Sequence, residues 1–214
     1  AKLKEAERRK LQELQAQLAE IQQLVGDLIR RQAGHNLDNV LLQGGQKLQK
    51  MDMADRQELL ADSQRDEKEM QDARSTRELD TSQRVTERNT RDVGKKAEKL
   101  PDPAPAAKLT VAADHMERAI VSLNNEKLAE AYDPPQVDAL AALRDARKLV
   151  DEALKKVQDQ LKDQDRESIR QAYVKLLEDQ KKVGKDIQDI DATPKDNGEL
   201  PRPVAIRLGQ LPGE

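Results

Sequence analysis

Apolar residues along this chain recur at alternating spacings of three and four, the period that places side chains on one stripe of an α-helix. The clearest run belongs to a helix that we predict over residues 2–32, and its members are Leu11, Leu14, Leu18, Ile21, Val25 and Leu28. Charged and amide side chains fill most of the positions between them. A stripe this narrow is covered by laying a second helix beside the first, so the pattern predicts an all-α fold.

The chain also lacks the large side chains that fill the centre of a thick globular domain. Its 214 residues include no Trp, no Phe and only two Tyr, while 37% of them are charged. Aromatic side chains bury the most area each, so their scarcity favours thin seams between helices over a rounded core. We therefore predict an elongated antiparallel coiled coil or three-helix-bundle array with long continuous helices.

Residues that break helices divide the chain. Gly34, Asn36, Asp38 and Asn39 predict a loop after the first helix, because Gly and Asn accept left-handed backbone and Asp and Asn cap helix ends. Proline interrupts helices by removing a backbone donor. The remaining breakers that we weigh are Gly44, Gly45, Pro101, Pro103, Pro105, Pro134 and Pro135. The further helices predicted between them cover residues 46–100, 106–132 and 136–160, and the last continues to about residue 190.

The stripe of the second predicted helix turns polar over residues 70–97. Gln83, Thr86 and Thr90 occupy inward positions there, and such side chains bury little apolar surface. This stretch is expected to be the most loosely packed part of the molecule.

The chain resembles itself at a distance. Residues 3–56 align with residues 161–214 without gaps, and Val25-Gly26 and Asp38-Asn39 fall on Val183-Gly184 and Asp196-Asn197. We interpret residues 1–160 as one helical repeat unit and residues 161–214 as the start of a second unit, whose first helix continues the preceding one. The chain begins at Ala1 and ends soon after a short helical signal, so we expect a piece of a longer protein.

No catalytic, cofactor-binding or metal-binding residue is predicted. His35 and His115 are the only imidazoles, and we interpret them as a loop residue and a helix-surface residue. The chain has no Cys, which excludes a thiol nucleophile and Cys-based metal sites. The loop at residues 191–197 holds Asp and Asn without the spacing of a calcium-binding loop, so turn and capping roles are favoured there. We predict no enzyme activity.

Five basic residues share one flank of the second predicted helix: Arg77, Arg84, Arg88, Arg91 and Lys95. Acidic residues alternate with them, and no aromatic side chain is present to stack on bases. A solvated flank is therefore favoured over a phosphate-binding strip. The net charge of −3, with both signs interspersed, gives no attraction to nucleic acid. We expect neither membrane insertion nor a small-molecule ligand, and the predicted partners are other protein segments or further copies of the repeat.

Residues 115–154 carry Met116, Ala119, Leu123, Ala139 and Leu143 in a hairpin-like order. This stretch resembles a hairpin in the helical repeat regions of large bacterial coiled-coil proteins of unknown function, which are often anchored to the cytoplasmic membrane. The resemblance implies a cell-envelope or periplasmic location and supplies no catalytic residues.

Three hypotheses for function remain. The first is a structural or scaffolding role, as a rod-like helical spacer of a larger repeated protein. The second is a protein-interaction module that binds a partner helix through the polar seam of residues 70–97. Reversible association with lipid through amphipathic helices is the third, and the missing aromatic residues disfavour it.

Overall fold

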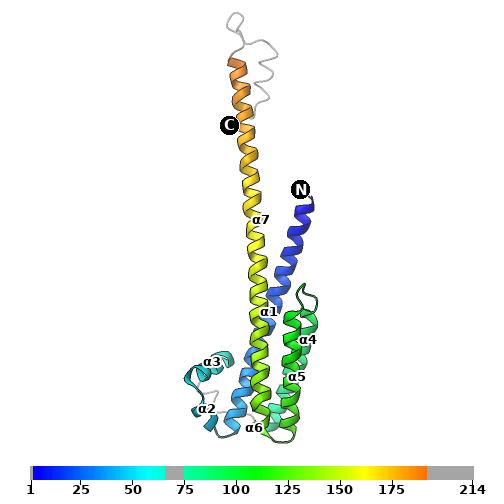
Figure 1. Cartoon of the computed structure of the whole chain (residues 1–214), viewed down its shortest axis with the longest axis vertical. Coiled ribbons are helices and arrows are strands. Elements are labelled where there is room, and N and C mark those ends of the chain that lie inside the picture. The colour runs from blue at the N-terminus through cyan, green and yellow to red at the C-terminus, as the bar shows by residue number, and fades with distance from the viewer. Residues whose placement is uncertain (1, 66–74, 192–214) are drawn as a thin grey trace, which may run out of the picture. The chain divides into compact units, whose positions relative to one another are not determined.

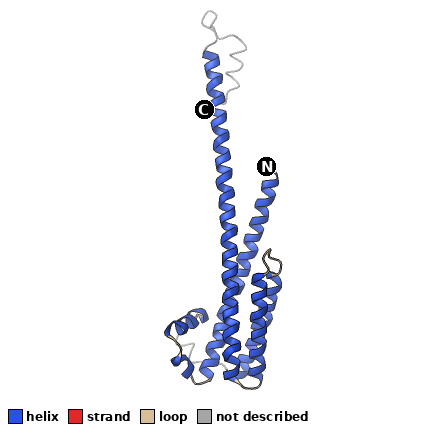
Figure 2. Cartoon of the chain, in the orientation of Figure 1, coloured by secondary structure: helices blue, strands red, loops and turns tan. Residues whose placement is uncertain are grey.

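A computed structural model describes residues 2–65 and 75–191, and every regular element in these ranges is helical (Figure 2). The prediction of an all-α fold is confirmed. The elements are α1 (Lys2–Leu42), α2 (Gln46–Lys50), α3 (Met53–Ser63), α4 (Thr76–Ala97), α5 (Ala104–Asn124), α6 (Leu128–Ala131), the π-helical turn η1 (Tyr132–Gln136) and α7 (Val137–Asp191). The chain divides into two compact units, residues 1–159 and residues 160–214.

The first unit is built mainly from α1, α4, α5 and the first part of α7 (Figure 1). The hairpin of α4 and α5 packs against α1 and the first part of α7. The largest fully buried apolar side chains of the first unit come from all four of these helices: Leu18, Leu37, Leu79, Leu109, Met116, Leu123 and Leu143. The second predicted helix is broken, and only its last part, α4, joins the bundle.

Helix α1 runs ten residues past its predicted end at residue 32, and the predicted loop at Gly34, Asn36, Asp38 and Asn39 is wrong. Residues 32–40 are all buried, so packing on every side holds them helical against their weak intrinsic propensity.

The end of α1 lies at a glycine pair instead. Gly44 and Gly45 have φ of 84° and 69°, and the Gly45 N–H donates to the Val40 carbonyl over 3.0 Å. Glycine adopts this left-handed backbone without a steric cost, which makes it a common helix terminator.

The continuous helix predicted over residues 46–100 is also wrong. Gln64 ends α3 with a left-handed φ of 53°, and α3 packs back on α1. Helix α4 then begins at a capping box, in which the Ser75 side chain accepts from the Glu78 N–H and the Glu78 carboxylate accepts from the Ser75 N–H. This Ser-x-x-Glu pattern is a start signal for helices, and the prediction weighed only the absence of proline.

The third predicted helix, over residues 106–132, is likewise interrupted. Helix α5 ends at Asn124, and Glu126 takes a left-handed φ of 58° before α6 begins. The fourth prediction succeeds, since α7 starts directly after the Pro134-Pro135 turn and continues unbroken to Asp191.

The polar seam is packed rather than loose where the structure describes it. Along α4 the inward positions Leu79, Gln83, Thr86, Thr90, Val93, Gly94 and Ala97 are all buried. They face α1 and α5, so the expectation of loose packing is wrong for residues 76–97. Residues 70–74 of the predicted seam lie outside the described residues.

In the second unit, the structure describes α7 from residue 160 to Asp191. Several large apolar side chains of this segment are exposed: Ile169, Tyr173, Val174, Leu176, Leu177 and Ile187.

Candidate functional site: a buried polar network and the groove beside it

Three side-chain amides meet in the core of the first unit. Gln83 of α4 donates from Nε2 to Oε1 of Gln32 on α1 over 2.7 Å, and Gln32 Nε2 returns a bond to Gln83 Oε1 over 3.4 Å. Gln136 of η1 donates from Nε2 to the same Gln83 oxygen over 3.0 Å. All three side chains are fully buried. The mutual bonds offset the cost of removing these amides from water.

Asparagines of α1 extend this network to the turn that precedes α7. Asn36 Nδ2 donates to the backbone carbonyl of Gln136 over 3.1 Å, and Asn39 Nδ2 donates to Gln136 Oε1 over 2.8 Å. Within α1, Gln32 Nε2 donates to Asn36 Oδ1 over 2.8 Å. Gln43, the residue after α1, donates from Nε2 to Asn39 Oδ1 over 2.6 Å. We call these six residues the amide network: Gln32, Asn36, Asn39, Gln43, Gln83 and Gln136. Hydrogen bonds between side-chain amides depend on direction. All of those in the network can form in only one register of α1 against α4 and η1.

His35 lies on the neighbouring face of α1 and contacts α4. Its Nε2 is 2.9 Å from Oγ1 of Thr86, and Thr86 Oγ1 also lies 3.1 Å from the carbonyl of Ser82. A carbonyl only accepts, so the Thr86 hydrogen goes to Ser82 and the hydroxyl oxygen accepts from His35 Nε2–H. His35 is buried in a helix, so its interpretation as a loop residue is wrong.

Asp38 of α1 forms an ion pair with Arg65, which lies two residues after the end of α3. Arg65 donates from Nη1 to Asp38 Oδ1, and from Nη2 to Asp38 Oδ2 over 3.0 Å. The Asp38 side chain is fully buried, whereas that of Arg65 is 17% exposed. Arg65 also lies over Gly34, since a Cβ placed there would stand 3.5 Å from its Nη2. That distance is an ordinary van der Waals contact, so the guanidinium packs closely on this turn of α1.

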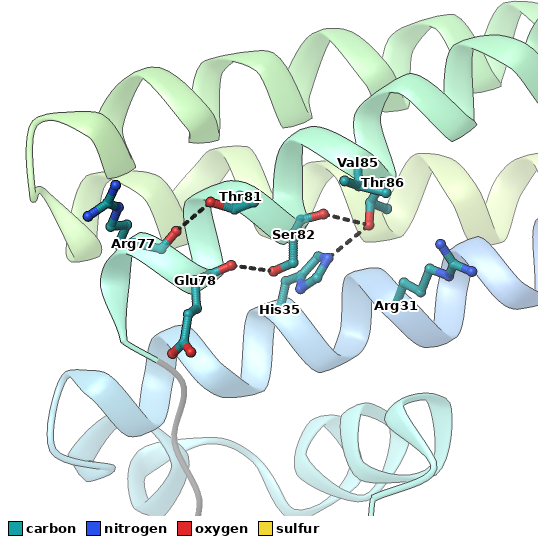
Figure 3. A pocket seen from close by; sticks show the side chains of 8 residues that line it. All are labelled: Arg31, His35, Arg77, Glu78, Thr81, Ser82, Val85 and Thr86. Carbon is teal, nitrogen blue, oxygen red and sulfur yellow. Dashed lines mark hydrogen bonds between the residues drawn. The ribbon is translucent and has the colours of Figure 1, made fainter.

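An open groove of about 680 Å³ lies beside the network, between α1 and α4 (Figure 3). Its lining residues are Arg31, His35, Arg77, Glu78, Thr81, Ser82, Val85 and Thr86. Figure 3 shows Arg31 and Arg77 at opposite ends of the groove, with His35 and Ser82 between them. The two guanidinium groups therefore do not converge on one point, as an anion site would require.

The hydroxyl groups of the groove are already engaged in hydrogen bonds to their own helix. Thr81 Oγ1 donates to the Arg77 carbonyl over 2.9 Å, and Ser82 Oγ donates to the Glu78 carbonyl over 2.8 Å. A nucleophilic hydroxyl would need to give its proton to a base such as histidine, whereas Thr86 accepts from His35. The groove is therefore not arranged for nucleophilic catalysis by Thr86.

The remaining residues singled out in the sequence lie apart from the network. His115 of α5 has its Nδ1 3.8 Å from Asp138 Oδ2, and its side chain is 20% exposed. No group of three His, Cys, Asp or Glu residues in the described ranges could hold a metal ion. The predicted turn at residues 191–197 lies outside those ranges beyond Asp191. In the part of the chain that the structure describes, no helix is apolar over a length that would cross a membrane.

The basic flank of α4 is an ion-paired surface. Arg84 Nε lies 3.0 Å from Asp80, and Arg91 contacts Glu87 on its own helix and Glu117 of α5, the latter over 3.0 Å. The hydrogen bond to Glu87 raises the pKa of Arg91 above its usual value. These pairs fit the prediction of a solvated flank.

The amide network was missed because Asn36 and Asn39 were assigned to a loop and Gln83 was treated as a weak seam residue. Gln32 and Gln136 were placed at the ends of predicted helices, with no partners. A signal was nonetheless present in the sequence. Gln32, Asn36, Asn39 and Gln43 follow the same three-and-four spacing as the apolar stripe before them. Such spacing indicates one helix face, and amides in that position predict partners across the seam.

No protein-family model, curated protein or solved structure was found to match the chain. The resemblance to bacterial coiled-coil proteins therefore stays a prediction.

Proposed function

We propose that this chain is a non-catalytic structural segment, a rod-like helical spacer within a larger repeated protein. The observation that carries the proposal is the continuity of α7, which runs from Val137 to Asp191 and contributes residues to both units. A helix that leaves one packed unit and continues into the next is the means by which helical repeats join without a flexible linker.

The amide network supports the same role. It fixes α1 against α4 and against η1, the turn that precedes α7. In a spacer, these hydrogen bonds would oppose sliding of the helices past one another. Buried polar networks are known to specify register in helical assemblies. The network offers no hydroxyl or carboxylate poised over a ligand, which also favours a structural purpose.

Small-angle X-ray scattering of the full chain tests the spacer. The 55 residues of α7 would span about 80 Å at 1.5 Å per residue, so we expect a maximum dimension at least that long. Proline at Asp163 should shorten the dimension by bending α7, while Asp163→Ala should leave it unchanged. A compact particle for the unmodified chain, or no effect of Asp163→Pro, would contradict the proposal.

The interaction module is the second candidate function. Its original site, the seam of residues 70–97, is covered by α1 and α5 over residues 76–97, so a partner helix would have to displace one of them. The specific observation that favours interaction is a different surface, the exposed apolar face of α7.

The repeat and the cell-envelope setting remain proposals as well. Asp38 and Asn39 lie inside α1 rather than in a loop, so the loop argument for the repeat is lost and the Val25-Gly26 match remains. Sequencing the gene beyond Glu214 would test the repeat, because the next codons should continue the alignment with residues that follow 56.

A further inference from the structure

The second half of α7 carries an uninterrupted heptad of its own. Its inward positions alternate spacings of four and three: Ile169, Tyr173, Leu176, Gln180, Val183 and Ile187. Five of these residues are exposed in the structure, with fractions of 57% for Ile169, 64% for Tyr173 and 54% for Leu176, and Val183 is half-buried. A sustained heptad with five apolar members of six is the pattern of a coiled-coil seam. We call these six residues the α7 stripe.

We propose that the α7 stripe binds the same stripe of a second copy of this chain, in a parallel and in-register two-stranded coiled coil. The five exposed members of the stripe lie open to solvent in the structure. A solvated helix draws little stability from propensity alone and gains most from burying its apolar face. A second copy supplies a face of matching length and chemistry.

The position of Gln180 selects the parallel register. In that arrangement the two Gln180 side chains face one another across the seam, and each amide can donate to the other. In the antiparallel arrangement that aligns the apolar residues best, Ile169 lies opposite Ile187 and Gln180 lies opposite Leu176. The amide would then be buried against an aliphatic side chain, which costs the desolvation of an unsatisfied polar group.

The flanking residues favour the same orientation. A parallel pair brings Asp165 beside Arg170 of the second copy, an attraction that occurs twice by symmetry. An antiparallel pair brings Asp179 beside Asp179 of the second copy, where like charges repel. Parallel pairing also sets Ala172 against Leu177 of the second copy, and Leu177 is 55% exposed in the single chain, so the apolar contact widens.

This inference does not rest on the spacer proposal. A segment can associate through α7 whether or not the whole chain acts as a spacer, and scattering from a dissociated variant tests the spacer separately. The two ideas can therefore fail independently.

Sedimentation equilibrium of the full chain over a range of concentrations tests the association. We expect a concentration-dependent shift from the monomer mass of 24.1 kDa to twice that value. Leu176→Glu places one charge on each of the two chains, both within the seam. It should raise the dissociation constant at least about a hundredfold. The matched control is Val174→Glu, because Val174 is 49% exposed but lies outside the stripe, and it should change the constant little.

Cysteine crosslinking tests the orientation, because the chain contains no native Cys. Ile187→Cys and Tyr173→Cys each place a thiol opposite its own copy in the parallel pair, so mild oxidation should give a disulfide-linked dimer with either variant. In the antiparallel pair, two residues at position 187 would lie roughly 27 Å apart along the axis, beyond the roughly 7 Å reach of a disulfide.

A chain that stays monomeric at all soluble concentrations overturns the proposal, as does equal weakening by Leu176→Glu and Val174→Glu. A dimer that forms no disulfide with either Cys variant overturns the parallel arrangement. Circular dichroism on each variant checks that the exposed substitutions leave the helix content intact.

Discussion

Gln136 donates a hydrogen bond to Gln83 at the centre of the first unit, although 53 residues separate them in the chain. Gln83 is also bonded to Gln32, so one amide joins η1, α4 and α1. Apolar side chains at these positions could slide past one another with little change in energy. The amides can form all their hydrogen bonds in one arrangement alone. That arrangement fixes the position of Gln136, the residue directly before α7, against α1 and α4.

Replacing Gln83 with Leu should therefore destabilise the protein. The change leaves the buried amides of Gln32 and Gln136 short of a partner, and each unsatisfied buried group costs about 1–3 kcal/mol. Urea unfolding followed by circular dichroism measures the loss. Gln171→Leu is the matched control, because Gln171 is exposed and bonds only Glu167 on its own helix. A Gln83→Leu protein as stable as the parent would show that the network contributes nothing to stability.

The ion pair of Asp38 and Arg65 should respond unequally to removal of its two members. Asp38 is fully buried, whereas Arg65 keeps 17% of its side chain exposed and can turn toward water. Arg65→Met leaves a carboxylate in the core without its guanidinium and should cost about 3 kcal/mol. Asp38→Asn should cost less, because the amide is uncharged and Arg65 can be solvated. Unfolding free energies of the two variants and of the double variant measure the order, and the reverse order would contradict this account.

The helical class of the chain could be predicted from spacing, because periods of three and four leave few other ways to cover an apolar stripe. The long α7 was predicted for the same reason, with the Pro134-Pro135 turn as its start. The prediction failed where burial of a helix outweighs the weak helix propensity of the Gly and Asn residues within it. Gly34 and Asn36 lie in a helix because the surrounding packing holds them there. The only local sign of that packing is the three-and-four spacing of the amide residues that continues the apolar stripe.

The missed break after α3 has the opposite cause. Gln64 adopts left-handed backbone without being Gly or Asn, so its residue type gives no warning. The spacing over residues 32–43 could place four members of the amide network on one helix face, but their partners Gln83 and Gln136 come from distant parts of the chain. These partners could be assigned only once the arrangement of α1, α4 and η1 was known.

Tyr132 should make stability depend on alkaline pH. Burial raises the pKa of its phenol, and the charges of Asp133 and Asp55 raise it further. Below the ordinary tyrosine pKa of about 10, the phenol is protonated in both states and its contribution is fully present. As the pH rises above that value, the unfolded chain ionises first, so the stability that Tyr132 contributes is lost.

The measurement is the difference in unfolding free energy between the parent and Tyr132→Phe across this pH range. As the pH rises, the unfolding free energy of the parent should fall relative to that of Tyr132→Phe. Tyr173→Phe is the control at concentrations where the chain is a monomer, because Tyr173 is the only other tyrosine and is 64% exposed in the single chain. The same variant leaves Tyr132 as the sole phenol, so its ultraviolet titration reports the raised pKa directly. A midpoint at or below the ordinary value would contradict the account.

Gly26 and Gly184, which the repeat alignment matches, should respond differently to Ala. A Cβ at Gly184 meets no atom within 4 Å, whereas one at Gly26 would stand 2.7 Å from Nη1 of Arg147. Arg147 donates from that nitrogen to the Gln22 carbonyl over 3.0 Å, so Gly26→Ala must displace this bond. In helix interiors, Ala is more stabilising than Gly by about 1 kcal/mol.

Gly184→Ala should therefore show the whole gain as higher helix content and a higher melting temperature. Gly26→Ala should show little net change, because the lost hydrogen bond offsets the gain. Thermal unfolding followed by circular dichroism compares the two, and an equal gain from both substitutions would mean that Arg147 moves aside without cost.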